Sequence, residues 1–108
     1  MTASKNVKEL NKNNFKETIK SGISLVDFWA AWCMPCRMQG PIIDNVADKI
    51  GDKANICKVN VDDNQDIAGE YGVMSIPTLI LFNNGKEVKQ FVGVQNEETL
   101  INAVNSVK

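Results

Sequence analysis

The sequence predicts one α/β domain over residues 1–108, a three-layer α/β/α sandwich in which four helices flank a mixed five-stranded sheet. Two observations support this prediction. Apolar segments of strand length alternate with amphipathic segments of helix length, in the order βαβαβαββα. The chain is also long enough for one hydrophobic core and too short for two. Strands separated by helices are expected to pair in parallel, and the last two strands should form an antiparallel hairpin at one edge.

The first two strands enclose a short helix. Residues 5–10 form a weak predicted strand, and a helix is expected over residues 15–20, with Asn13 or Asn14 at its N-cap. The nearly continuous apolar run over residues 24–29 is typical of a strand that is buried on both faces.

A long helix is predicted over residues 33–50, with Gly51 as its C-terminal signal. Residues 55–61 form the third strand, and residues 65–71 form another short helix. The apolar positions of the long helix recur at spacings of three and four, which indicates a stripe that faces the core. These expected core positions are Met38, Ile42, Ile43, Val46, Ala47 and Ile50.

The C-terminal part of the chain contains a hairpin and a helix. Residues 78–82 and 87–92 are the predicted strands, and the Asn-Asn-Gly sequence over residues 83–85 favours a tight turn between them. Asn96 can cap the last helix. The apolar residues of this helix are Leu100, Ile101, Val104 and Val107.

Charge and composition exclude several classes of protein. The net charge is −1, so the chain has no large basic field for nucleic acid or an anionic membrane. The N-terminal residues lack the apolar stretch of a secretory signal, and no segment reaches transmembrane length. We therefore expect a cytoplasmic protein. Structural disulfides are rare in that compartment, and three cysteines would leave one unpaired.

The strongest chemical signal is the pair Cys33 and Cys36 at the predicted junction of a strand and a helix. Backbone N–H groups and the helix dipole favour a thiolate there, which predicts electron exchange with disulfides of other molecules. A structural zinc site is the alternative, but it needs four ligands, usually cysteine and histidine. The chain has no histidine and only one further cysteine, Cys57, so redox chemistry is favoured over a metal site.

Asp27 interrupts an otherwise apolar strand. A buried carboxyl must be protonated, paired or hydrogen-bonded, and burial raises its pKa toward the range of a general acid or base. The alternative is a solvent-facing edge position, which the flanking apolar residues disfavour. In the neighbouring strand, side-chain alternation places Lys58 on the face opposite Cys57 and Val59. We expect Cys57 to be an inert core thiol, with a regulatory or dimerising thiol as the alternative.

Several motifs follow one another along the chain, namely Val26-Asp27-Phe28-Trp29, Trp32-Cys33-Met34-Pro35-Cys36-Arg37-Met38, Pro41, Lys58-Val59-Asn60-Val61-Asp62, Ile76-Pro77-Thr78 and Gly93. In this order they resemble the thioredoxin family over essentially the whole chain. Two positions depart from the family pattern. Met34-Pro35 separates the cysteines where the family carries Gly-Pro, and Met74-Ser75 replaces a glycine-containing pair. A methionine beside the cysteines can alter the reduction potential or the set of partners.

The resemblance implies a role for each polar group. Cys33, with the more exposed sulfur, is the nucleophile that attacks a substrate disulfide, and Cys36 resolves the mixed disulfide. Asp27 accepts a proton, through water, when Cys36 becomes a thiolate. Lys58 tunes the pKa of Asp27, although from the residues alone it is equally a solvated strand lysine.

The resemblance also implies a cis peptide bond before Pro77, which would present the backbone of Ile76 to an extended substrate. Without the resemblance, a trans proline that opens a strand is the expectation. Trp32 and Pro35 are expected to support the active site, and Trp29 is expected to pack in the core. The expected substrate-binding residues are Trp32, Met34, Met74, Ile76, Gly93 and Val94.

The leading hypothesis is a cytoplasmic protein-disulfide reductase that uses a reversible Cys33–Cys36 couple. It would act as a monomer, without a bound cofactor or metal, and a separate thioredoxin reductase would regenerate it. Two alternatives stay open. The changed dipeptide is compatible with a disulfide oxidant or isomerase, and the apolar rim is compatible with a binding module in which redox chemistry is incidental.

Overall fold

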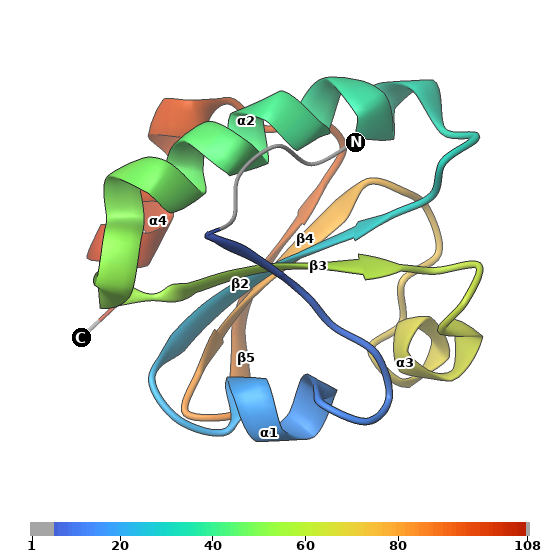
Figure 1. The fold of residues 1–108 in the computed structure, drawn as a ribbon, viewed down its shortest axis with the longest axis horizontal. Helices are drawn as coiled ribbons and strands as arrows, with labels where there is room; N and C mark the ends of the chain where they lie inside the picture. Colours follow the sequence, from blue (N-terminus) through green and yellow to red (C-terminus); the bar gives the residue numbers. More distant parts are fainter. Residues whose placement is uncertain (1–5, 108) are drawn as a thin grey trace.

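The computed structural model describes residues 6–107 (Figure 1). Within this range the chain forms five strands, four α-helices and a short 3-10 helix over Gly51–Lys53. Residues 1–5, which include the first position of the expected first strand and most of the stretch considered for a secretory signal, lie outside the described residues. None of the described helices is long and apolar enough to cross a membrane.

The sheet has the strand order β1–β3–β2–β4–β5. The strands β1 (Val7–Glu9) and β2 (Ile23–Trp29) each pair in parallel with β3 (Asn55–Asn60). The strand β4 (Thr78–Asn83) is antiparallel to both β2 and β5 (Lys86–Val92). The sheet is therefore mixed, as the sequence predicts.

The direction of β4 corrects one expectation, because a strand that follows a helix was expected to pair in parallel. The intervening helix α3 (Gln65–Glu70) has six residues. The helical part of the connection covers only about 9 Å, against about 20 Å for a six-residue strand, so α3 does not return the chain along the sheet as a long crossover helix does. β4 instead starts beside the end of β3, because Phe28 is the register partner of both Val59 and Thr78.

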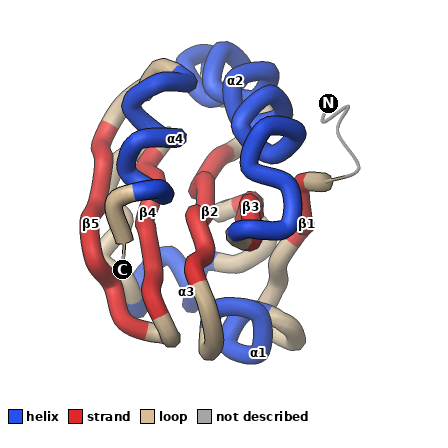
Figure 2. Tube along the Cα trace, turned by 90° about the vertical axis from the view of Figure 1, so that its left-hand side faces the viewer, coloured by secondary structure: helices blue, strands red, loops and turns tan. Residues whose placement is uncertain are grey.

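Two helices cover each face of the sheet (Figures 1 and 2). The helices α2 (Met34–Ile50) and α4 (Glu97–Asn105) lie on one face, and α1 (Phe15–Ile19) and α3 lie on the other. Alternate residues of β2 enter different cores, as the two-residue period of a strand requires. Leu25 packs in the core under α2 and α4, whereas Val26 and Phe28 pack in the core on the side of α1 and α3.

The expected end signals are confirmed except at α1. Asn96 caps α4 by accepting a hydrogen bond from the Thr99 backbone N–H at 2.8 Å, and Gly51 ends α2. Asn14 occupies the N-cap position of α1, but its side chain makes no capping hydrogen bond. Its Oδ1 accepts from the backbone N–H of Asn11 instead, at 2.7 Å.

The core-facing stripe of α2 differs from the expectation at one position. Met38 is 64% exposed, whereas Gln39 is completely buried. Consecutive helical residues differ by about 100° in direction, so the residue that continues the stripe three positions after Cys36 is Gln39. Met38 was assigned to the core because it is apolar, but the helical period places Gln39 at that position of the stripe.

Candidate active site

The dithiol residues lie at the junction between β2 and α2. Cys33 is the N-cap residue of α2, with an extended backbone, and Cys36 lies in the first helical turn. The two cysteines form a disulfide, with 5.2 Å between their Cα atoms. Pro35 is also in the first turn, where its missing N–H leaves no intrahelical bond unmade. The structure thus places both cysteines and Pro35 at the junction that the sequence predicts.

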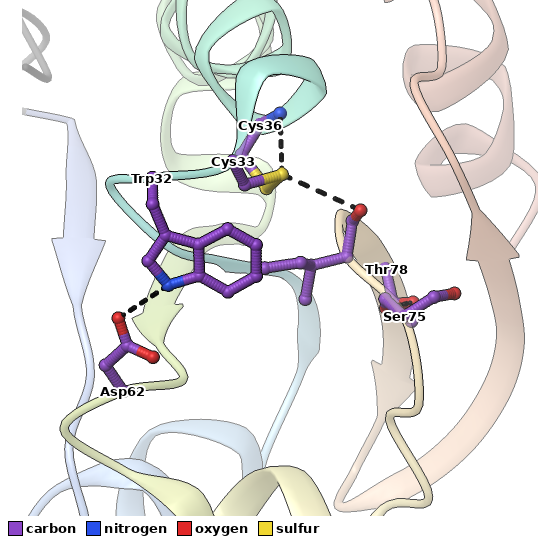
Figure 3. The surroundings of a disulfide bond; sticks show 7 residues. Trp32, Cys33, Cys36, Asp62, Ser75 and Thr78 are labelled. Carbon is purple, nitrogen blue, oxygen red and sulfur yellow. Dashed lines mark hydrogen bonds between the residues drawn. A yellow bond between two sulfur atoms is a disulfide. The ribbon is translucent and has the colours of Figure 1, made fainter.

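The environment of Cys33 favours negative charge on its sulfur. The backbone N–H of Cys36 donates a hydrogen bond to Cys33 Sγ at 3.2 Å, and the N-terminus of α2 adds its dipole (Figure 3). The carbonyl oxygen of Ile76 lies 3.7 Å from the same sulfur. The exposed fractions of Cys33 and Cys36 are 5% and 4%, so residue exposure does not separate them in the disulfide state.

The two cysteines line different spaces. Cys36 lines an inner cavity of about 230 Å³ together with Asp27 and Lys58. Cys33 lines a separate surface groove of about 540 Å³. Cys33 and Asp27 therefore line different spaces, and Cys36 is the cysteine that shares a cavity with the acid.

Asp27 is a buried carboxyl with an unusual proton affinity. Its residue is 1% exposed, and burial raises its pKa to about 7, while the positive charge of Lys58 opposes that rise. Oδ1 of Asp27 has no hydrogen-bond partner among the described residues. Lys58 itself is 6% exposed, and its Nζ lies 4.4 Å from the ring centroid of Trp29. Trp29 was expected in the core, but it is half-buried, lines the same cavity and packs against the small cluster of Ala30, Cys33 and Cys36.

The surface groove is lined mainly by apolar side chains. Met74 is 96% exposed and Met34 is 66% exposed, so both departures from the family pattern enlarge its apolar surface. The residues that line the groove are Trp32, Cys33, Met34, Pro35, Val61, Val73, Met74, Ser75 and Ile76. Four of the expected substrate-binding residues, namely Trp32, Met34, Met74 and Ile76, are therefore brought together around Cys33.

Gly93 and Val94 approach the site from another side. The peptide bond between Ile76 and Pro77 is cis. The backbone N–H of Gly93 donates to the Pro77 carbonyl oxygen at 2.8 Å, and Gly93 has a φ of 92°, a region that favours glycine. Gly93 thus lies next to Pro77, and neither Gly93 nor Val94, the residue after it, lines the groove itself.

Two residues near the site were not found by sequence reasoning. Asp62 accepts a hydrogen bond from Trp32 Nε1 at 3.0 Å, which orients the exposed indole beside the disulfide (Figure 3). Gln39 pairs with the backbone of Gln95 through both ends of its side-chain amide. In the sequence, Asp62 and Asp63 are typical of a solvated acidic loop. Gln39 interrupts an apolar stripe and matches no motif.

Cys57 has the surroundings expected of a core thiol. It is fully buried among apolar residues on the face of the sheet opposite Lys58, and burial raises its pKa to about 12. A dimerising role would need an exposed sulfur, so the burial of Cys57 argues against it. Within the described residues, no group of three or more histidine, cysteine, aspartate or glutamate side chains is placed to hold a metal ion.

Comparisons with known proteins agree with this geometry. A sequence model of the thioredoxin family matches residues 6–106. The thioredoxin of Staphylococcus saprophyticus is 45% identical over 96 residues, which are 89% of this chain and 92% of that protein. The thioredoxin of Chlamydia pneumoniae is 48% identical over 99 residues, which are 92% and 96% of the two chains.

A solved structure gives the same result for the fold. The structure of a mutant thioredoxin from Halobacterium salinarum NRC-1 matches with a TM-score of 0.86 and 34% sequence identity. The match covers 98% of this chain and 95% of that one. Sequence, fold and the disulfide at the start of α2 lead to one conclusion. The chain belongs to the thioredoxin family.

Proposed function

We propose that Cys33 and Cys36 are the reacting groups of this protein-disulfide reductase, with Cys33 as the nucleophile and Cys36 as the resolving residue. Members of the thioredoxin family are protein-disulfide oxidoreductases, and this chain carries the dithiol that such exchange requires. The observation that carries the assignment is the division of the two cysteines between two spaces. Cys33 lines the open groove, and Cys36 lines the cavity that holds Asp27.

The exchange takes place in two substitutions at sulfur. The Cys33 thiolate attacks one sulfur of a substrate disulfide, that S–S bond breaks, and the other substrate sulfur leaves as a thiolate. The Cys36 thiolate then attacks Cys33 Sγ, and the second substrate sulfur leaves. Two electrons pass to the substrate, which becomes a dithiol after protonation, and the protein becomes the Cys33–Cys36 disulfide. The N–H of Cys36 supports the first step by stabilising the Cys33 thiolate.

Asp27 is proposed to accept the proton that Cys36 loses before the second substitution. A carboxyl with a pKa of about 7 can take up and release a proton near neutral pH, which an ordinary aspartate cannot. Asp27 and Cys36 line the same cavity, which has room for the bridging water. Lys58 is proposed to keep the pKa of Asp27 from rising further.

The substrate is proposed to be an extended protein segment that carries a disulfide. Its backbone would pair with Ile76, and its side chains would contact the apolar rim, which includes Trp32, Met34 and Met74. An apolar rim without charged groups suits many unrelated partners. We further propose a cytoplasmic location, a monomeric state and a thioredoxin reductase as electron donor.

Trapping of the mixed disulfide tests the assignment of the two cysteines. Cys36→Ser should accumulate a covalent complex with insulin that dithiothreitol releases, because no resolving thiol remains. Cys33→Ser should form no such complex under the same conditions. The reverse pattern would overturn the assignment.

The reduction potential of the Cys33–Cys36 pair tests the direction of transfer. Equilibration against glutathione buffers, with tryptophan fluorescence as the readout, should give a potential well below the glutathione poise. A potential at or above that poise would contradict the reductase and favour an oxidant or isomerase.

A further inference from the structure

A buried glutamine connects the helix that carries the dithiol to a loop on the other side of the site. Gln39 lies on α2, three residues after Cys36, and none of its surface is exposed. Its Nε2 donates to the Gln95 carbonyl oxygen at 3.0 Å, and its Oε1 accepts from the Gln95 backbone N–H at 2.7 Å. The side-chain amide therefore satisfies both polar groups of one peptide residue, as a neighbouring strand would.

The loop that Gln39 holds is fixed by hydrogen bonds and not by hydrophobic packing. It spans residues 93–96 between β5 and α4, and no residue from 92 to 99 is buried. Hydrophobic packing therefore does not determine its position. The N–H of Gly93 bonds to the Pro77 carbonyl oxygen at 2.8 Å, and the side chain of Gln95 donates to the Gly93 carbonyl oxygen at 3.1 Å. The contact with Gln39 connects this loop to α2, and an ion pair between Lys49 and Glu97 joins α2 to the first residue after the loop.

We propose that Gln39 is a positioning residue for protein substrates, which fixes the loop of Gly93 and Val94 relative to the dithiol on α2. The inference rests on the proposed function, because it takes Gly93 and Val94 as part of the substrate-binding rim. Gln39 touches neither sulfur, so it acts on docking and not on the exchange chemistry. Both hydrogen bonds end on the fully buried amide of Gln39, where an unmade bond is costly, so they favour one position of the loop.

The consequence is a distinction between large and small disulfides. A protein substrate must contact the rim on both sides of Cys33, so a loop that moves independently of α2 reduces productive docking. A small disulfide needs only the sulfur of Cys33. Loss of the Gln39 contact should therefore slow the reaction with a protein disulfide and leave the reaction with a small disulfide unchanged.

Single-turnover oxidation of the prereduced protein tests this distinction. Gln39→Met keeps a similar side-chain length but removes both hydrogen bonds, and Gln90→Met makes the same change at an exposed position of β5. In Gln39→Met, the second-order rate constant for insulin should fall roughly three- to tenfold. The rate constant for bis(2-hydroxyethyl) disulfide and the reduction potential should stay at the values of the unmodified protein. Gln90→Met should change none of them.

Each other outcome has a distinct meaning. An unchanged insulin rate in folded Gln39→Met overturns the inference and leaves the proposed function intact. Equal losses on both disulfides also overturn it, because Gln39 would then act through the dithiol. If the unmodified protein fails to reduce insulin, the proposed function itself is wrong.

Hydrogen exchange provides a test that needs no variant. The N–H of Gln95 should exchange far more slowly than the amide of an unstructured peptide, because its acceptor is a buried side chain. Exchange at the unstructured rate would overturn the inference even if Gln39→Met does not fold.

Discussion

Asp27 and Lys58 are register partners on the parallel strands β2 and β3. The two residues line the same inner cavity, together with Cys36. Burial raises the pKa of Asp27 to about 7, and the positive charge of Lys58 counteracts part of that rise. The pairing of one buried acid with one strand lysine thus leaves a carboxyl that titrates in the neutral range in the cavity that Cys36 lines.

The raised pKa of Asp27 should make the oxidised protein less stable as the pH rises from about 4 to about 7. In that window the folded carboxyl keeps its proton and the unfolded carboxyl does not, so the folded state binds more protons. The free energy of unfolding should fall by roughly 3–4 kcal/mol across the window through this group. Urea unfolding of Asp27→Asn should lack this slope, whereas Asp52→Asn, at an exposed position, should keep it. Equal slopes in both variants would contradict the burial argument.

Lys58 should lower the pKa of Asp27 directly. Removal of the positive charge in Lys58→Met should move the carboxyl titration above its position near 7, because only desolvation then acts on Asp27. Carbon-13 NMR of the aspartate carboxyl would measure the shift. Lys89→Met removes an exposed lysine from β5 and should leave the titration unchanged. A downward shift in Lys58→Met would show that Lys58 does not act through its charge.

The sequence predicts the layers of the fold because its apolar periods are strong. The dithiol junction and the glycine turns also carry local signals that do not depend on the rest of the chain. The direction of β4 was missed because it depends on where the connection over residues 61–77 places the start of the strand, which a helix between two strands does not determine. The exposed Met38 was misassigned because a count of apolar residues does not say which side of α2 faces the sheet.

The candidate site is predictable only in part. Cys33, Cys36 and Asp27 stand out in the sequence because their residue types conflict with their surroundings. Asp62 and Gln39 do not stand out, because each acts on a residue far along the chain. The partner of Asp62 is Trp32, and the partner of Gln39 is Gln95. Such pairs become visible only when the fold brings the elements together.

Cys57 should be inert in the folded protein. Its sulfur is buried, and burial raises its pKa to about 12, so almost no thiolate is present at pH 8. Iodoacetamide should therefore modify Cys33 and Cys36 in the reduced folded protein and spare Cys57 until urea unfolds the chain. Mass spectrometry of the alkylated protein would count the modified thiols. Rapid modification of Cys57 without unfolding would contradict its placement in the core.

Asp62 should assist the reduction of protein disulfides through Trp32. The indole of Trp32 is 70% exposed, so packing does not hold it, and its hydrogen bond to Asp62 is the contact that orients it. Asp62→Ala should lower the rate constant for insulin reduction about two- to fivefold, because a single hydrogen bond to a charged but exposed group is worth about 1 kcal/mol or less. The adjacent variant Asp63→Ala removes the same charge without touching the indole.

The comparison of these two variants separates hydrogen bonding from charge. If the indole contact matters, only Asp62→Ala should slow the reaction and speed the hydrogen exchange of the Trp32 indole N–H. If both variants change the insulin rate equally, the local negative charge is responsible and Asp62 has no positioning role. Asp62→Asn keeps an acceptor oxygen without the charge, so its rate should lie between those of Asp62→Ala and the unmodified protein.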